Sequence, residues 1–134
     1  MIEDNPADVY LLRLALDAHG VSYDLDVLAD GQQAIDYVEK VERAELAPPA
    51  LYLLDLNLPV YGGLEVLRRI RMSAGPFHCR TAILTTSDAP ADREQAHILG
   101  VDLYVQKPMN IDDFIGLGAP LKDLCYSACA SGDQ

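Results

Sequence analysis

The strongest indication of the fold of this chain is residues 50–63, Ala-Leu-Tyr-Leu-Leu-Asp-Leu-Asn-Leu-Pro-Val-Tyr-Gly-Gly. The stretch opens with an unbroken apolar run and reaches one carboxylate, Asp55. Such a run is typical of a parallel β-strand that is covered on both faces, and Pro59, Gly62 and Gly63 then require a loop before the next helix. We therefore expect Asp55 at the carboxyl end of a central strand, where open parallel sheets bind ligands. Taken alone, Asp55 is equally well a structural acid at a strand end or helix cap.

Helical and strand patterns alternate on both sides of this stretch. We expect helices at residues 6–19, 31–47, 64–74 and 89–99 and from 110 or 112 onward, with Asn5 and Asp88 capping the first and the fourth. Glycines and a proline should kink the last helix. Strands are expected at 21–29, 50–54, 81–84 and 103–105; the first alternates apolar and polar residues, as a half-exposed strand at or near an edge does. This order indicates an α/β domain with a parallel sheet.

The composition indicates a globular protein and limits its partners. The chain has 134 residues, 50% of them hydrophobic, and a formal net charge of −11. This charge disfavours binding to nucleic acid or to an anionic membrane, and it favours divalent cations and basic protein partners. No apolar segment approaches the ~20 residues of a membrane span, and no signal-peptide pattern opens the chain. Because the 3 cysteines form no Cys-x-x-Cys pair, we expect reduced thiols in a cytoplasmic protein.

Polar residues stand at the ends of successive predicted strands: Glu3-Asp4, Asp55, Thr85 and Lys107. The strands of a parallel sheet point the same way, so these ends should converge. Clustered carboxylates repel one another, and a hard divalent ion such as Mg²⁺ relieves that repulsion. A lysine, a hydroxyl and a metal ion together stabilise charge on a transferring phosphoryl group, and an aspartate can accept that group as an acyl phosphate.

Each of these residues also has an ordinary structural explanation. Glu3 and Asp4 suit the start of a helix, where acids complement the helix dipole. Thr85 suits a helix cap, and Lys107 suits a solvated surface. Their occurrence at successive strand ends is what favours the chemical interpretation.

Four phrases in the chain resemble the receiver domains of two-component response regulators. They are Glu-Asp-Asn-Pro-Ala-Asp-Val at 3–9, Leu-Asp-Leu-Asn-Leu-Pro at 54–59, Leu-Thr-Thr-Ser at 84–87 and Val-Gln-Lys-Pro at 105–108. The chain most resembles the single-domain regulators that pair with phytochrome-type histidine kinases. The resemblance implies a flavodoxin-like, doubly wound parallel sheet, with a single receiver domain at residues 1–124 and a C-terminal tail at 125–134.

The resemblance also implies a role for each motif residue. Asp55 would accept a phosphoryl group from a phosphohistidine on a partner histidine kinase, possibly a bacteriophytochrome. Asp4, Asp55 and the backbone carbonyl of Asn57 would bind Mg²⁺, with Glu3 acting largely through water. Lys107 would pair with a phosphoryl oxygen, and its bond to the following proline would be cis.

Signal output is likewise implied by the resemblance. Thr85 and Tyr104 would form the switch, acting on the face made by the fourth helix, the last strand and the last helix. Asn57 and Ser87 would tune hydrolysis of the acyl phosphate, and Thr86 would narrow access to it. A homodimer is expected to use either this face or an exchanged strand.

One departure from the family concerns its first strand, which lies in the middle of the sheet. Only Met1 and Ile2 stand where about five apolar residues are expected, which predicts a gap of ~9–10 Å with unpaired inner edges. Three explanations are open: a late start of the chain, which we favour; a strand supplied or exchanged by a partner chain; or closure of the flanking strands. Closure would displace Glu3 and Asp4, so the metal site depends on the answer.

Three functions fit these residues to different degrees. The first is a phosphorylated signalling switch rather than an enzyme. The second is a receiver-like module for binding or dimerisation that works without phosphorylation. The third, an aspartyl-phosphate hydrolase, is disfavoured because such enzymes usually carry an acid-base Asp two residues after the nucleophile, where this chain has Asn57.

Overall fold

The computed structural model describes residues 1–73 and 79–132, with side chains up to Tyr126. In chain order the helices and strands are α1 (Pro6–Ala18), α2 (Gly31–Glu42), β1 (Leu51–Leu54), α3 (Gly63–Met72), β2 (Arg80–Thr85), α4 (Pro90–Ile98), β3 (Leu103–Gln106), α5 (Ile111–Gly116) and α6 (Gly118–Gly132). None of these helices combines the length and the apolar character needed to cross a bilayer, within the described part of the chain.

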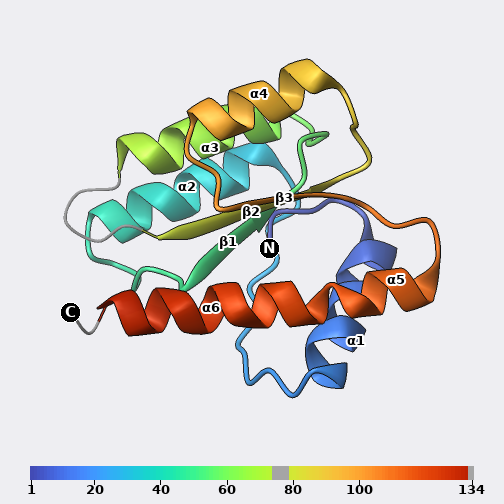
Figure 1. Cartoon of the computed structure of the whole chain (residues 1–134). Coiled ribbons are helices and arrows are strands. Elements are labelled where there is room, and N and C mark those ends of the chain that lie inside the picture. The colour runs from blue at the N-terminus through green and yellow to red at the C-terminus, as the bar shows by residue number, and fades with distance from the viewer. Residues whose placement is uncertain (74–78, 133–134) are drawn as a thin grey trace.

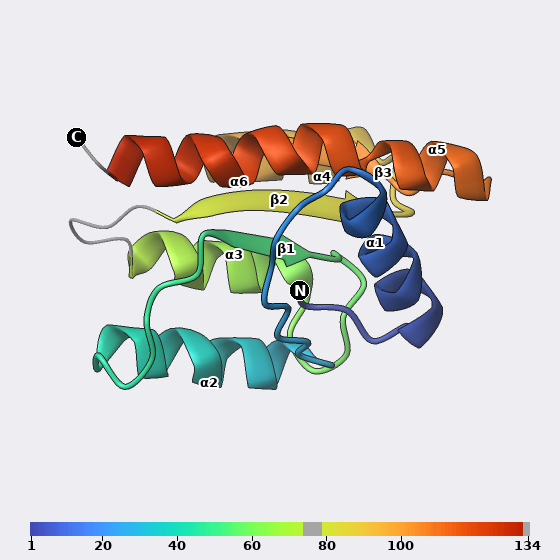
Figure 2. The ribbon, with the colours of Figure 1, turned by 90° about the horizontal axis from the view of Figure 1, so that it is seen from below.

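The three strands form a parallel sheet in the order β1-β2-β3. Leu51 pairs with Arg80 at the start of β1, and Ala82 pairs with Leu103 at the start of β3. Helices α2, α3 and α4 cover one face of the sheet, and α1, α5 and α6 cover the other (Figures 1 and 2). The predicted α/β class and doubly wound parallel arrangement are therefore confirmed.

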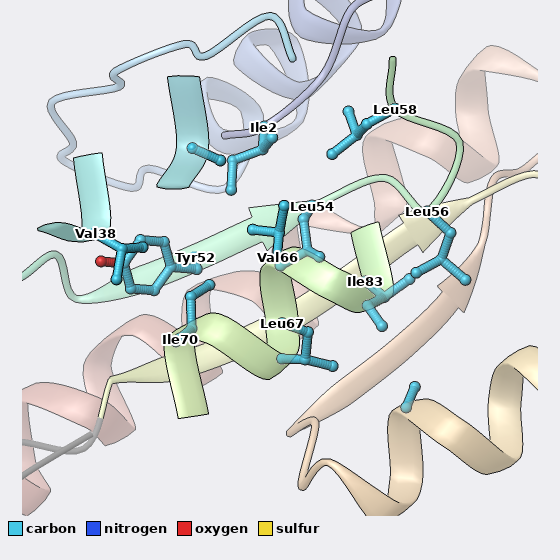
Figure 3. Close-up of a cluster of buried hydrophobic side chains, with 12 residues drawn as sticks. Ile2, Val38, Tyr52, Leu54, Leu56, Leu58, Val66, Leu67, Ile70 and Ile83 are labelled. Atoms are coloured by element: carbon cyan, nitrogen blue, oxygen red, sulfur yellow. The ribbon is translucent and has the colours of Figure 1, made fainter. Parts of the chain in front are cut away.

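Burial on both faces explains why β1 is an unbroken apolar run. Tyr52 and Leu54 enter the cluster on the α2–α3 face, where Ile2 joins them (Figure 3). Leu53 points the other way, into the cluster under α1 and α6. Successive residues of a strand face opposite sides, so a strand between two helical layers needs apolar residues at every position.

The residues Met1 and Ile2 take the place of the central strand at its carboxyl end. Ile2 forms parallel bridges to both Leu28 and Leu54. Its N–H donates to the Leu53 carbonyl at 2.7 Å and its carbonyl accepts from the Asp55 N–H at 3.1 Å. The flanking segments therefore stay apart at this level, and the closure explanation is wrong for the carboxyl end.

The track of this central strand runs between β1 and residues 21–28, and its amino-end half holds no strand among the described residues. Residues 21–27 are not part of any strand, so the strand predicted at 21–29 is wrong except for the bridge at Leu28. The physical reason is that a strand needs a partner for its backbone N–H and C=O groups. For residues 21–29 the last such bond on this side comes from the Met1 nitrogen, which donates to the Asp26 carbonyl at 2.7 Å. An open cavity of about 470 Å³ lies here. Its apolar lining includes Leu12, Leu16, Val21, Leu25, Leu51 and Leu121.

The helix boundaries follow the capping residues in most cases. Asn5 caps α1 through the Ala7 N–H, as predicted. The predicted cap at Asp88 is wrong: the cap residue of α4 is Ala89, which makes no side-chain cap. The nearby Ser87 hydroxyl accepts the Ala89 N–H instead, at 3.3 Å.

The last helix divides at Leu117 into α5 and α6, in agreement with the predicted kink. Gly118 lies so close to the Ala15 carbonyl that any side chain would collide with it. Glycine is therefore needed where α6 packs on α1.

Candidate functional site

Asp55 lies immediately after β1 and is 6% exposed. The loop that follows turns back over it, because the Gly63 N–H donates to the Leu56 carbonyl at 3.0 Å and Gly63 packs directly on the Asp55 carbonyl. One carboxylate oxygen of Asp55, Oδ1, accepts the Asn57 N–H at 3.1 Å. The strand end and the glycine loop together hold this carboxylate in one orientation.

Lys107 is the first residue after β3, and its side chain reaches Asp55. Its N–H donates to the Thr85 carbonyl at 2.6 Å, which fixes the backbone at this point. Its ammonium group donates to Glu3 Oε2 at 2.9 Å, to Asp8 Oδ2 at 2.6 Å and to Asp55 Oδ2 at 2.9 Å. Three carboxylates from distant parts of the chain thus meet on one buried cation.

The Lys107–Pro108 peptide bond is trans, like the other peptide bonds of the described residues. The cis bond implied by the family resemblance is therefore wrong. The carboxylates and the Thr85 carbonyl set the direction of the lysine.

The surroundings shift the pKa values of these groups in different directions. For Asp55, burial acts to raise the pKa, but the Asn57 N–H and the Lys107 ammonium outweigh it, and the pKa lies below its usual value. For Glu3, burial is the larger effect and raises the pKa to about 7, with Lys107 opposing it and the negative Asp55 adding to it. Although burial opposes it, the pKa of Lys107 is raised by its hydrogen bonds to the three carboxylates. Asp55 is therefore ionised at neutral pH.

Three acids can hold a cation together. Carboxylate oxygens of Glu3, Asp4 and Asp55 lie within 4.8 Å of one another. Glu3 is buried and also accepts the Asn5 N–H at 3.2 Å, whereas Asp4 is exposed. Because Ile2 keeps its place in the sheet, the acid pair is not displaced. Oxygen ligands of this kind suit hard divalent ions.

Thr85 lies beside Asp55 and is fully buried. Its hydroxyl accepts the Ser87 N–H at 3.3 Å and is among the hydrogen-bonding groups that lower the pKa of Asp55. Thr86 is exposed, and the Asn57 amide reaches its hydroxyl at 3.5 Å. The side chains of Asn57 and Thr86 therefore meet at the solvent side of Asp55.

Tyr104 connects the site to α4. Its hydroxyl donates to the Ser87 carbonyl at 3.2 Å, and the Arg93 guanidinium lies 4.6 Å from the centre of its ring. The Ser87 hydroxyl donates to Asp92 at 2.6 Å. The segment after β2, the start of α4 and strand β3 are thus linked through one serine and one tyrosine.

Sequence reasoning missed two of these residues, Asp8 and Arg93. A signal for Asp8 was present: it lies in the first turn of α1, four residues after Asp4. Helical side chains lean toward the amino end of the helix, so an acid at this position points back at the strand ends. Arg93 gave no comparable signal, because its contact depends on how α4 packs beside β3.

A family model, the response regulator receiver domain, matches residues 1–117. The chain belongs to the response regulator receiver domain family. The family residues discussed above lie within the matched range, and solved members share the α/β fold with its parallel sheet, so the flavodoxin-like assignment holds.

Three known proteins illustrate the relationship. The response regulator Rcp1 of Synechocystis sp. is 33% identical over 114 residues, which cover 84% of this chain and 78% of Rcp1. The crystal structure of phosphorylated RcpA, a cyanobacterial phytochrome response regulator, has a TM-score of 0.83 at 31% identity and covers 94% of this chain and 91% of RcpA. The transcriptional regulatory protein TrcR of Mycobacterium tuberculosis is 35% identical over 115 residues, 86% of this chain, but the chain spans only 41% of TrcR.

A crystal structure of the Mn²⁺-bound form of Rcp1 is also available for comparison. This structure has a TM-score of 0.80 at 30% identity and covers 91% of this chain and 88% of Rcp1. Rcp1 and RcpA therefore resemble this chain over most of their own length, whereas TrcR does so over less than half.

Proposed function

We propose that Asp55 accepts a phosphoryl group from a partner histidine kinase. The observation that carries this proposal is the combination of an ionised, buried Asp55 with Lys107 at 2.9 Å and the acid pair beside it. An Asp55 oxygen would form a bond to phosphorus while the phosphorus–nitrogen bond of the kinase phosphohistidine breaks. Lys107 would stabilise the charge that develops on the phosphoryl oxygens.

The metal for this step is Mg²⁺, held by Asp4, Asp55 and the backbone carbonyl of Asn57, with Glu3 acting largely through water. The donor set fits: the carboxylates are clustered, and Mg²⁺ uses a few carboxylates while retaining waters. The relative Rcp1 has a structure in its Mn²⁺-bound form, which supports the binding of a divalent ion. When bound, the ion neutralises the carboxylates and the transferring phosphoryl group.

Thr85 and Tyr104 form the switch. Thr85 lies beside Asp55, and Tyr104 is linked through Ser87 to the segment that carries Thr85. A hydroxyl drawn toward a new phosphoryl group would pull on this segment, so that Tyr104 turns inward behind it. The change would then reach the face formed by α4, β3 and α5.

The lifetime of the acyl phosphate depends on Asn57, Thr86 and Ser87. Asn57 and Thr86 stand at the exposed side of Asp55, where a hydrolytic water would enter. Ser87 acts less directly, through its N–H on Thr85.

The partner is a histidine kinase of the phytochrome class, as the names of the relatives suggest. The protein acts in the cytoplasm as a signalling switch and not as an enzyme. Its receiver domain spans residues 1–124, and the segment proposed as a C-terminal tail, 125–134, begins within α6. A homodimer would form through the α4, β3 and α5 face or through strand exchange at the amino-end cavity. Exposed apolar side chains on the first of these surfaces are Ile98, Met109 and Ile111.

The test is Asp55→Asn, with Asp36→Asn on α2 as a control for charge. We expect acetyl phosphate with Mg²⁺ to label the wild type and the control but not Asp55→Asn, as measured by intact-protein mass spectrometry. Full labelling of Asp55→Asn would overturn the proposal.

The same experiment distinguishes the second candidate function, a module that works without phosphorylation. The open amino-end cavity is the observation in its favour. A folded wild type that neither binds Mg²⁺ in a titration nor takes up label would support this candidate in place of the first.

A further inference from the structure

The Lys107 ammonium has no donor left for a phosphoryl group. An ammonium group carries three N–H bonds, and the carboxylates of Glu3, Asp8 and Asp55 accept them all. A phosphoryl oxygen on Asp55 therefore gains a hydrogen bond from Lys107 only if one of these three acids gives up its own.

We propose that Asp8 occupies the position on Lys107 that the phosphoryl oxygen takes. Asp8 is then a positioning residue: it holds the lysine in place before the reaction and leaves when the anion arrives. This inference rests on the proposed function of Asp55, and it concerns a residue outside the acid pair and the phosphorylated aspartate.

Burial identifies Asp8 as the acid that leaves. The side chains of Glu3, Asp55 and Asp8 are 1%, 7% and 17% exposed, respectively. Releasing a carboxylate to water costs least where water already reaches it, and a phosphoryl donor must approach from the solvent side. Asp8 combines the greatest exposure with the shortest contact to Lys107, 2.6 Å.

The acid cluster supports the same choice. Glu3 and Asp55 belong with Asp4 to the group whose oxygens lie within 4.8 Å of one another, and Asp8 does not. A divalent ion in that group would engage Asp55 directly and Glu3 largely through water, so Asp8 would be the remaining counter-ion of Lys107.

Two effects of opposite sign follow from this arrangement. Without the charge of Asp8, Lys107 is freer to pair with an incoming anion, so affinity for a phosphoryl analogue rises. The local negative charge also falls by one, so affinity for a divalent cation falls. A purely structural role for Asp8, as an acid in the first turn of α1, would lower the stability of the helix without this opposite pair of changes.

The experiment compares Asp8→Asn with Asp8→Glu, which keeps the charge, and with Asp17→Asn at the far end of the same helix. The Mg²⁺ affinity is measured first, and beryllofluoride is then titrated at saturating Mg²⁺; both titrations are followed by NMR of the backbone amides. For Asp8→Asn we expect beryllofluoride to bind about threefold or more tightly and Mg²⁺ to bind a few-fold more weakly. Asp8→Glu and Asp17→Asn should stay within about twofold of the wild type.

The outcomes separate this inference from the proposed function. Weaker or unchanged beryllofluoride binding by Asp8→Asn would overturn the role of Asp8, provided that the wild type binds the analogue and Asp55→Asn does not. If Asp55→Asn also binds the analogue, the phosphoryl-acceptor assignment itself fails.

Discussion

The two ends of the sheet differ in what lies between β1 and the segment that precedes α2. At the carboxyl end, Ile2 bridges Leu28 and Leu54, and the functional side chains meet just beyond it. At the amino end, the same track holds an open cavity. The comparison shows that Met1 and Ile2 suffice to place the acid pair beside Asp55, although the amino end of the same track holds no strand among the described residues.

The backbone groups that face the cavity show what the amino end lacks. The N–H and C=O of a strand residue point to the same side. The Leu53 carbonyl accepts the Ile2 N–H on this side, so the Leu53 N–H also faces the track. Because alternate residues of a strand face the same side, the N–H and C=O of Leu51 face the track as well. Within the described part of the chain, none of these three groups has a hydrogen-bond partner on this side.

The largest effect is expected from Ile2→Ala. Ile2 is 1% exposed and joins two neighbours of the sheet, so its truncation should lower the free energy of unfolding by ~2–5 kcal/mol. Urea unfolding at equilibrium measures this change. The matched variant is Leu25→Ala at the cavity, which should cost ~1 kcal/mol or less because Leu25 is only half-buried. Equal costs at the two positions would contradict the difference between the two ends.

A smaller effect of opposite sign is expected from filling the cavity. A Val-Leu-Val extension joined to the Met1 nitrogen would continue the track in register and meet the open groups of Leu51 and Leu53. The side chain of the added leucine would point into the cavity, toward Leu12 and Leu16. Burial of these side chains, less the entropy of ordering three residues, should raise the free energy of unfolding by ~2 kcal/mol.

The control for the cavity is a Ser-Asp-Ser extension of the same length. It offers the same backbone but cannot bury its side chains favourably, so no stabilisation is expected. Equal unfolding midpoints for the two extensions would show that this track does not accept an apolar strand.

The last effect concerns the pH dependence at the carboxyl end. The pKa of Glu3 is about 7 in the fold, against ~4.3 in an unfolded chain. Between these values the folded protein holds a proton that the unfolded chain has lost, so the contribution of Glu3 to stability is present at low pH and is lost as the pH rises through about 7. The lowered pKa of Asp55 changes the free energy of unfolding only in more acidic solution.

The measurement is the free energy of unfolding in metal-free buffer at about pH 5 and about pH 8, for the wild type and for Glu3→Gln. The wild type should lose more stability than the variant over this interval. A larger loss in Glu3→Gln would contradict the raised pKa.

Local patterns were enough to predict much of the chain. The apolar run before Asp55 is buried on both faces, as expected, and Asn5 caps the first helix. The larger failure, at residues 21–29, occurred where distant residues decide the outcome. The alternation at 21–29 has the period of a strand, but too few residues lie beside it to complete a ladder. Asp88 is an acceptable cap by residue type, yet Ser87 reaches the Ala89 N–H instead.

The α/β order and the strand-end positions of Asp55, Thr85 and Lys107 follow from local patterns, because apolar period and turn residues act over a few neighbouring positions. That Ile2 holds the acid pair in place, and that Asp8 shares Lys107 with Glu3 and Asp55, follows from tertiary packing. These outcomes depend on hydrogen bonds and charges between residues up to 104 positions apart. Such contacts exist only once the layers have packed.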